Sequence, residues 1–184
     1  MINRGGVKPP LLFGKKEEQM RIAQVVQDSI VDGPGFRLAV FTQGCPHGCP
    51  GCHNPETHDF SGGTEMTVEE IIEKLKKNPL MKGLTLSGGE PFCQAEECTR
   101  LAELARENGV RNVWAYSGWT FEQLLNSEDS GKISLLRQLD VLVDGPFILS
   151  QRSLAIPWRG SKNQRLIDVK ASLEAGTAVE WQPA

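Results

Sequence analysis

Residues 44–55 read GCPHGCPGCHNP and come directly after the apolar segment 36–42, which is typical of a buried β-strand. Three cysteines, Cys45, Cys49 and Cys52, fall within this stretch, and no fourth cysteine lies close by. A 4Fe–4S cluster usually takes four cysteine ligands. Three thiolates on one short loop therefore predict a cluster with one iron left open. An open position is where a metal centre binds a substrate rather than holds structure.

Two other metal sites fit the same loop. Cys49-Pro-Gly-Cys52-His53 matches the C-x-x-C-H pattern of haem attachment, although nothing in the sequence directs export. A zinc ion closed by the three cysteines and one histidine is the stronger alternative, with His47, His53 or His58 as the fourth ligand. Zinc ligands usually come as two separated pairs, whereas this is one compact loop. The spacing favours the cluster and leaves zinc open.

The composition limits the class of protein. The chain has 184 residues and a net charge of −3, which predicts one domain with a substantial core. So mild a charge argues against a dedicated nucleic-acid binder. The sequence contains no apolar stretch long enough to span a membrane, and its start lacks a secretory apolar core. We therefore expect a cytoplasmic protein whose cysteines are metal ligands, catalytic groups or buried thiols rather than disulfides.

The chain divides into a short arm and one domain. Residues 1–20 carry glycine, proline and lysine without periodicity, and we expect a loose arm there. Over residues 21–184 strand-like and helix-like segments alternate, which predicts a single domain built on a parallel sheet with helical crossovers. The expected strands are 22–28, 36–42, 84–87, 112–116, 140–144 and 164–169. One expected helix starts at a capping box formed by Thr67 and Glu70, and the others occupy 94–108, 121–126 and 133–139.

Unusual loops follow four of these strands. They are the cysteine loop and the loops that begin at Ser87, Tyr116 and Asp144. The carboxyl ends of parallel strands gather functional groups at one rim of a sheet. A complete eight-stranded barrel needs about 250 residues, which is more than this chain has. We therefore predict an α/β fold that forms a partial, open (β/α) barrel with parallel strands.

The cysteine loop followed by SGGEP at 87–91 resembles the radical S-adenosylmethionine superfamily. Within it, DGPGFR at 32–37, VDGPF at 143–147 and RGSKNQR at 159–165 resemble the activating proteins of anaerobic ribonucleoside-triphosphate reductases. The likeness runs from about residue 25 to residue 169. One departure is Gly51, because many superfamily members carry an aromatic residue before the third cysteine.

The resemblance implies that residues 21–184 form a radical SAM domain, which cleaves S-adenosylmethionine reductively on a 4Fe–4S cluster. Cys45, Cys49 and Cys52 would hold the cluster, and S-adenosylmethionine would occupy the open iron. One electron breaks the C5′–S bond, and the resulting 5′-deoxyadenosyl radical takes a hydrogen atom from a glycine α-carbon of the reductase. The cofactors carry this chemistry, so no side chain is assigned a catalytic role. The implied partners are the glycyl radical subunit of anaerobic ribonucleoside-triphosphate reductase and a flavodoxin- or ferredoxin-like electron donor.

The resemblance also implies which residues contact S-adenosylmethionine. They are Ser87, Gly88, Gly89, Glu90, Pro91, Ser117 and Asn54. Gly88 and Gly89 would let the backbone approach the methionyl group, because they have no Cβ. Glu90 would accept a hydrogen bond from the ammonium group of the cofactor. Asn54 and His53 would orient the cluster through hydrogen bonds.

Other residues and functions keep alternatives. Arg159 and Arg165 either bind the partner protein or close the barrel, and Arg37 either pairs with a carboxylate inside the sheet or steers a substrate. Cys93 and Cys98 lack cluster spacing, and we expect both to be buried thiols. The alternative functions are an activase of the pyruvate formate-lyase type, a non-enzymatic iron–sulfur electron carrier and a zinc-stabilised binding module.

Overall fold

A computed structural model describes residues 19–183 of the chain. Most of the arm expected over residues 1–20 lies outside these described residues. The last two positions of that range, Gln19 and Met20, begin strand β1 (Gln19–Ser29), where Met20 is fully buried. The folded domain therefore starts no later than Gln19.

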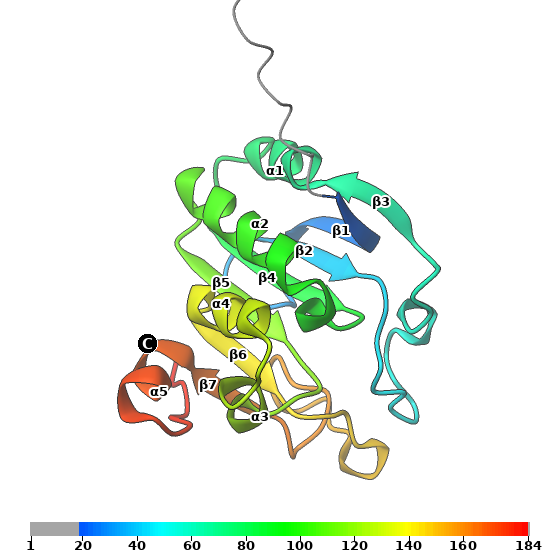
Figure 1. The fold of residues 1–184 in the computed structure, drawn as a ribbon, viewed down its shortest axis with the longest axis vertical. Helices are drawn as coiled ribbons and strands as arrows, with labels where there is room; N and C mark the ends of the chain where they lie inside the picture. Colours follow the sequence, from blue (N-terminus) through cyan, green and yellow to red (C-terminus); the bar gives the residue numbers. More distant parts are fainter. Residues whose placement is uncertain (1–18, 184) are drawn as a thin grey trace, which may run out of the picture.

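A single seven-stranded mixed sheet forms the centre of the molecule, in the order β3-β1-β2-β4-β5-β6-β7 (Figure 1). The other strands are β2 (Arg37–Thr42), β3 (Thr64–Thr67), β4 (Gly83–Gly88), β5 (Asn112–Tyr116), β6 (Val141–Asp144) and β7 (Arg165–Asp168). Strands β2, β4, β5 and β6 pair in parallel. The prediction of an α/β fold with parallel strands is thus confirmed for the middle of the sheet.

The expectation that the whole sheet is parallel is wrong at both edges. Strands β1 and β3 pair antiparallel on one side, and β7 pairs antiparallel with β6 on the other. The link explains the direction of the β1–β2 pair, because a parallel pair needs a crossover of about a dozen residues or more. A short turn joins β1 to β2, and no α-helix lies between β6 and β7.

The described part of the chain also contains five α-helices and three short 3₁₀ turns. The helices are α1 (Val68–Lys76), α2 (Ala95–Glu107), α3 (Phe121–Leu125), α4 (Ser130–Gln138) and α5 (Val169–Ala175). The turns are η1 (Pro55–Thr57), η2 (Pro91–Gln94) and η3 (Leu149–Gln151). The predicted capping box of Thr67 and Glu70 is confirmed at the start of α1. Helix α4 begins before the predicted residue 133, because Asp129 caps it. Strand β3 and helix α5 were not predicted.

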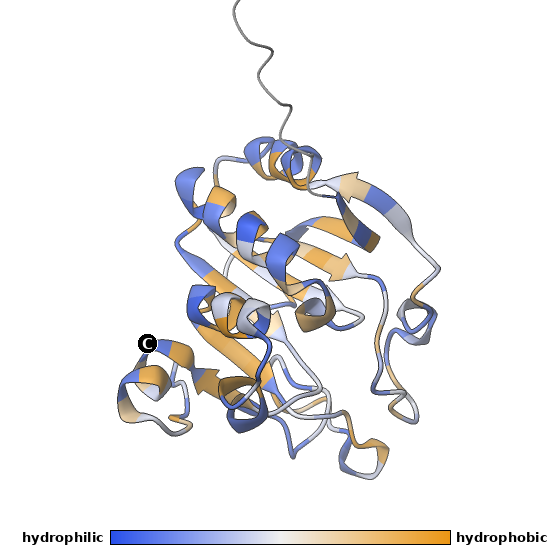
Figure 2. Cartoon of the chain, in the orientation of Figure 1, coloured by the Kyte–Doolittle hydropathy of each residue, from blue (hydrophilic) through white to orange (hydrophobic). Residues whose placement is uncertain are grey.

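The helices gather on one face of the sheet. Each crossover among the parallel strands moves one place in the same direction, and crossovers of one hand then lie on the same side. Figure 1 shows α1, α2 and α4 in front of the strands, and Figure 2 shows apolar strands beneath helices with hydrophilic outer faces. Alternate strand residues such as Leu84, Leu86, Val113 and Leu142 join the large core shared with the helices. The opposite face of the sheet is therefore free to form a site.

That opposite face carries a second apolar cluster and a buried arginine. Trp114 packs edge-on against Trp158 and Trp181. The guanidinium of Arg37 donates to Thr85 Oγ1 at 2.6 Å and to the Leu84 carbonyl at 2.8 Å, and it has no carboxylate partner among residues 19–183. Burial lowers the pKa of Arg37 to about 10, so it stays charged at neutral pH. Arg37 thus ties the strands together by neutral acceptors, and the expected pairing with a carboxylate is wrong.

Candidate cofactor-binding site

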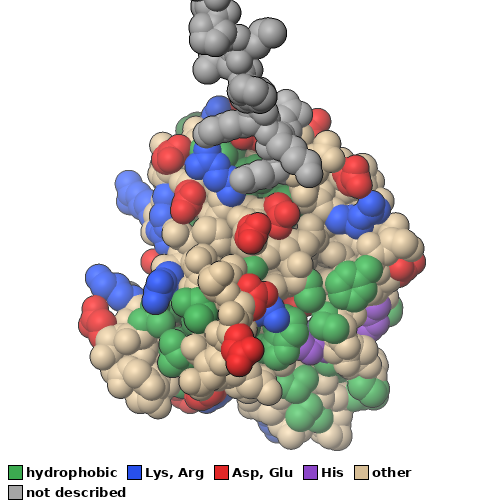
Figure 3. All heavy atoms as spheres, viewed as in Figure 1, with side chains coloured by type: hydrophobic (Ala, Val, Ile, Leu, Met, Phe, Trp, Pro, Cys, Tyr) green, Lys and Arg blue, Asp and Glu red, His purple; other side chains and the backbone are tan. Residues whose placement is uncertain are grey.

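The three cysteines of the loop after β2 line one small cavity of about 100 Å³. Around it lie Gly88 and Gly89 from the end of β4 and Ser117 from the end of β5. The cavity is therefore built where neighbouring parallel strands end, as the sequence predicted. All three histidines of the chain lie in or just after the cysteine loop. Figure 3 shows histidine side chains among hydrophobic ones at the lower right of that view.

A larger cavity of about 690 Å³ adjoins the cysteine cavity. The two share the lining residues Cys52, Gly88, Tyr116, Phe147 and Gln164. Asn54 and Ser87, both expected to contact a cofactor, line the larger cavity. A group held by the cysteines would thus face a second space that is large enough for an organic ligand.

Backbone hydrogen bonds anchor both ends of the cysteine loop. The Cys45 amide donates to the His58 carbonyl at 3.2 Å, and the Cys52 amide donates to the Cys49 carbonyl at 3.1 Å. Gly48 and Gly51 have φ angles of +57° and +73°, a conformation that favours glycine. The glycines therefore let the loop turn tightly enough for its three thiols to line one cavity.

The geometry of the loop does not offer a closed zinc site. Across residues 19–183, no three His, Cys, Asp or Glu side chains converge on a point that would hold one metal ion. The cysteine ligands of a cluster bind different irons, so a cluster does not require the three thiols to converge on one point. His47 is also engaged elsewhere, since its Nε2 lies 2.7 Å from Glu90 Oε2. Burial raises the pKa of the Cys45 thiol.

Gly88 and Gly89 are required by their protein neighbours. Gly88 has a φ angle of +91°, and a Cβ there would lie 2.6 Å from the Cα of Phe41. A Cβ on Gly89 would lie 2.5 Å from the carbonyl oxygen of Gly44, at the start of the cysteine loop. The two glycines thus let the loops after β2 and β4 touch, and both also line the small cavity.

Glu90 is fully buried and lines neither cavity. Its Oε2 lies 2.7 Å from His47 Nε2 and accepts from the Ser117 hydroxyl at 3.1 Å and from the Gly118 amide at 2.9 Å. Its Oε1 accepts from the Phe92 amide at 3.1 Å. The carboxylate therefore joins the loops after β2, β4 and β5 from beneath the cavities.

The remaining predicted contacts are placed as follows. Ser117 lines the small cavity, although its hydroxyl already bonds Glu90 and accepts from the Trp119 amide at 3.1 Å. Pro91 is buried at the start of η2 and lines neither cavity. The Asn54 amide donates to Cys52 Sγ at 3.4 Å, so the residue after the loop reaches a ligand sulfur through its backbone.

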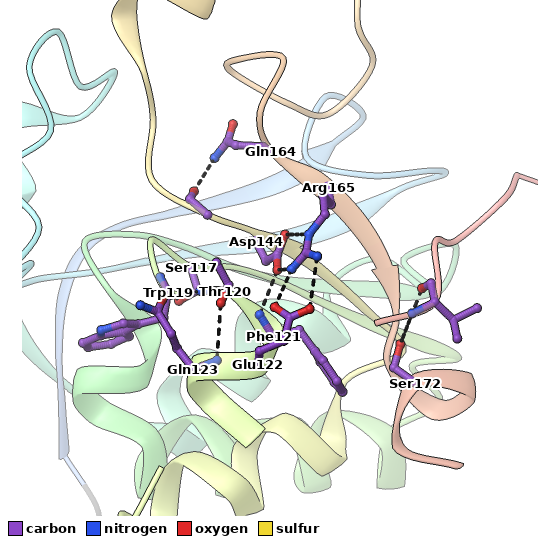
Figure 4. A network of polar contacts seen from close by, with 12 residues as sticks. Ser117, Trp119, Thr120, Phe121, Glu122, Gln123, Asp144, Gln164, Arg165 and Ser172 are labelled. Carbon is purple, nitrogen blue, oxygen red and sulfur yellow. Dashed lines mark hydrogen bonds and ion pairs between the residues drawn. The ribbon is translucent and has the colours of Figure 1, made fainter. Parts of the chain in front are cut away.

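The RGSKNQR segment at 159–165 closes the sheet beside this site. Gln164 Nε2 donates to the Gly145 carbonyl at 3.1 Å, and Asn163 Nδ2 donates to the Pro146 carbonyl at 2.8 Å. Arg165 pairs with both Asp144 and Glu122 (Figure 4). Of the two roles expected for Arg165, the structure therefore supports the structural one, at the β7 edge of the sheet. The sequence did not predict the Glu122 pairing.

Two buried nitrogens in the cavity walls have no hydrogen-bond partner among the described residues. They are His58 Nε2, in the wall of the small cavity, and Arg159 Nε, in the wall of the large one. Burying a polar group without a partner costs about 1–3 kcal/mol, so such groups usually have a ligand or water nearby. Neighbouring protein atoms cover both nitrogens, so a ligand in either cavity would reach them only after the wall shifts.

Some site residues escaped the sequence prediction. His47 was considered only as a zinc ligand, and Tyr116, Phe147 and Trp158 were not assigned to the cavity walls that they line. The signal for His47 was its place among the small residues of GCPHGC, which leave the imidazole as the one large side chain there. The expectation for Cys98 is confirmed because it is buried, whereas Cys93 is exposed and the expectation for it is wrong. In the same η2 turn Pro91 and Phe92 are buried, so the turn packs these two residues inward and leaves Cys93 exposed.

Comparison with known proteins identifies the family. Over 152 residues the chain is 38% identical to the anaerobic ribonucleoside-triphosphate reductase-activating protein of Vibrio cholerae, a match that covers 79% of this chain and 96% of that protein. This chain belongs to that family. Other activating proteins of the family, from Haemophilus influenzae and Enterobacteria phage T4, are 34% and 33% identical, over 79% and 80% of this chain and 96% and 93% of theirs.

A second comparison concerns the domain itself. Residues 31–167, which span the cysteine loop and the parallel strands, match the family model of a 4Fe-4S single cluster domain. Among solved structures, QueE from Escherichia coli superposes with a TM-score of 0.46 at 18% identity, over 55% of this chain and 54% of QueE. A likeness of that size decides nothing about function. Among the described residues, no helix has the length and apolar character needed to cross a membrane.

Proposed function

We propose that this chain is a glycyl-radical activase of anaerobic ribonucleoside-triphosphate reductase. Cys45, Cys49 and Cys52 would hold a 4Fe–4S cluster, with S-adenosylmethionine on the open iron. When bound, these cofactors supply a 5′-deoxyadenosyl radical that takes a hydrogen atom from a glycine of the reductase. The observation that carries the proposal is that the three-cysteine cavity adjoins a much larger cavity and shares five lining residues with it. The relatives named as reductase activases favour this function over an electron carrier or a formate-lyase activase.

The residues of the large cavity suit S-adenosylmethionine. Gly88 borders both cavities and lets the end of β4 lie close to a ligand that joins them. Ser87 and Asn54 add polar groups at the same boundary. Arg159 and His58 add the two buried nitrogens that lack protein partners. We propose that these groups bind the polar parts of the cofactor, while Glu90 and Pro91 support the loop from below.

Aromatic side chains of the large cavity would shield the reaction. Tyr116, Phe147 and Trp158 form part of its wall. Closing such a space expels water, which would otherwise compete for hydrogen bonds with the ligand and take part in side reactions. No acid or base is required of these residues, because the cofactors carry the chemistry. In the proposal these residues position the cofactor and exclude water.

The partner's glycine segment would enter through the mouth of the large cavity. Val31 and Leu154 line that cavity and are 73% and 88% exposed, so the mouth has an apolar border. We propose that the fold is a partial, open barrel over residues 21–184 whose open side the reductase covers. A flavodoxin- or ferredoxin-like protein would supply the electron, and the cytoplasm would be the place of reaction.

The direct test is transfer of the radical. Reconstituted protein, a chemical reductant, S-adenosylmethionine and the purified reductase are combined without oxygen. We expect 5′-deoxyadenosine in the solution and a glycyl radical signal on the reductase in electron paramagnetic resonance (EPR) spectra. Formation of 5′-deoxyadenosine without that signal would assign the chain to another substrate. Absence of both, in protein that carries a full cluster, would contradict the proposal.

A further inference from the structure

Glu90 is a buried carboxylate whose hydrogen-bonding capacity is already in use. Its side chain has an exposed fraction of 0%, and it bonds one imidazole, one hydroxyl and two backbone amides. Three of these partners meet its Oε2 and the fourth meets its Oε1. A ligand in either cavity would have to displace one of these donors to reach Glu90.

The side chain of His47 contacts three residues. It bonds Glu90, packs edge-on against Trp119 with ring centroids 4.6 Å apart, and rests against Gly118. A Cβ on Gly118 would lie 2.4 Å from the imidazole, so only glycine leaves room for the ring. His47 stands between Cys45 and Cys49 in the chain. The contact with Glu90 therefore holds the middle of the cysteine loop against the loops after β4 and β5.

We infer that Glu90 is a positioning residue that acts through His47 on the cysteine loop, rather than a contact of S-adenosylmethionine. The inference rests on the proposed function, because it assumes that this loop holds the cluster. It replaces the hydrogen bond to the cofactor's ammonium group that the sequence led us to expect. A cluster with only three protein ligands depends strongly on a loop that is preorganised. Replacing residues that hydrogen-bond to the ligands of a metal site typically lowers metal affinity by about 10–100-fold.

Two variants separate the hydrogen bond from the packing. Glu90→Gln keeps the shape of the side chain but replaces one acceptor oxygen by a donor. His47→Phe keeps a ring against Gly118 and Trp119 but removes the nitrogen that bonds Glu90. The double variant shows whether the two residues act together, because contacts that share one interaction are not additive. Glu107→Gln, at the exposed end of α2, is the control.

The first measurement is the rate of cluster loss. Each variant is reconstituted anaerobically, and the cluster absorbance is followed after an iron chelator is added. We expect Glu90→Gln and His47→Phe each to speed the loss about 10-fold, and the double variant to be no faster than the faster single variant. The control should match the unaltered protein. Additive effects, or an unchanged rate in Glu90→Gln, would overturn the inference.

The second measurement asks whether Glu90 touches the cofactor. S-adenosylmethionine is titrated into the reduced, loaded variants, and the midpoint of the change in the EPR signal is recorded. We expect that midpoint to stay unchanged in Glu90→Gln. A midpoint raised about 10-fold with normal cluster retention would make Glu90 a cofactor contact and contradict the inference.

A third measurement needs no cluster at all. In unloaded protein, amide hydrogen exchange over residues 44–52 should be faster in Glu90→Gln than in the control, because the loop has lost its anchor. Gly118→Ala leaves Glu90 intact but displaces the ring of His47, and it should give the same result. Unchanged exchange in both variants would overturn the inference. Failure of the unaltered protein to take up iron would instead count against the proposed function alone.

Discussion

Two buried carboxylates stand at the carboxyl edge of the parallel strands, and their partners differ in kind. Asp144, at the end of β6, is 1% exposed and pairs with the guanidinium of Arg165. Glu90, after β4, is 0% exposed and bonds the imidazole of His47, a hydroxyl and two amides. The first joins two strands and a helix, whereas the second joins the cysteine loop to its neighbours. Similar burial at one edge therefore serves the fold in one case and the site in the other.

The difference lies in what each network supports. Arg165 bonds Asp144 and Glu122 together and so connects β6, β7 and α3 (Figure 4). None of these three residues lines the small cysteine cavity, although their chain neighbours Gly145 and Gln164 do. The Glu90 network contains few charges but reaches the cysteine loop directly through His47. We therefore expect changes near Asp144 to lower stability and changes near Glu90 to lower cofactor retention.

The largest effect is expected at the cluster ligands that the Glu90 network supports. Replacing Cys45, Cys49 or Cys52 by Ala should abolish cleavage of S-adenosylmethionine, because each thiolate holds a different iron. The matched control is Cys93→Ala, at an exposed cysteine outside both cavities, which should keep most of the activity. Release of 5′-deoxyadenosine measures both. Loss of activity in Cys93→Ala equal to that in the loop variants would mean that the ligand assignment is wrong.

On the fold side, Arg165→Ala leaves the buried Asp144 without its cation. Breaking a buried ion pair from one side typically costs about 3–5 kcal/mol, and the partial exposure of Arg165 favours the lower figure. Urea unfolding measures the free energy of unfolding. Arg106→Ala, which breaks a more exposed pair with Asp140, is the control and should cost about 1 kcal/mol or less. Equal losses of unfolding free energy in the two variants would contradict the expectation that the buried pair with Asp144 stabilises the fold more than the exposed pair with Asp140.

Arg159 lies in the same segment as Arg165, but we expect its replacement to reduce radical transfer rather than stability. Its Nε is buried in the wall of the large cavity without a partner among the described residues, so Arg159→Ala breaks no internal bond. We expect the free energy of unfolding to change by about 0.5 kcal/mol or less. A lost charged hydrogen bond is worth about 1.5–3 kcal/mol, so radical transfer should fall by roughly 10–100-fold. Lost stability with normal transfer would reassign Arg159 to the fold.

The smallest effect is expected at Glu122, the exposed end of the Asp144 network. The hydrogen bonds from Arg165 lower the pKa of Glu122 to about 2. A lowered folded-state pKa gives stability that is present above the unfolded pKa and is lost as the pH falls toward 2. Because Glu122 is largely exposed, we expect at most about 1 kcal/mol. The gap in urea midpoint between the unaltered protein and Glu122→Gln should shrink from pH 6 to pH 3, and a gap that grows would contradict this.

Much of this fold was visible in the sequence where local signals are strong. The capping box at Thr67 and Glu70 and the apolar run at 112–116 were predicted and are observed. The antiparallel edges were missed because strand direction depends on how a link crosses the sheet, which residues 145–164 do not reveal. Strand β3 was missed because its four residues, TEMT, are partly exposed and carry no clear alternation.

The site was predicted best where chemistry requires particular residues. The cysteines were found by their spacing and Gly88 and Gly89 by the resemblance, and all five line one cavity. The role of Glu90 depends on burial and on His47, which lies 43 positions away in the chain. Long-range partners of this kind leave no local pattern. The pairing of Arg165 with Glu122 was missed for the same reason.

The central claim is that the three cysteines hold a cluster whose open iron binds S-adenosylmethionine. The most direct measurement is the EPR spectrum of the reconstituted, reduced protein before and after S-adenosylmethionine is added. We expect a reduced 4Fe–4S signal whose shape and field positions change on addition, because the ligand at one iron changes. A cluster signal that stays the same at saturating S-adenosylmethionine, or protein that binds zinc tightly and takes up no iron, would contradict the claim.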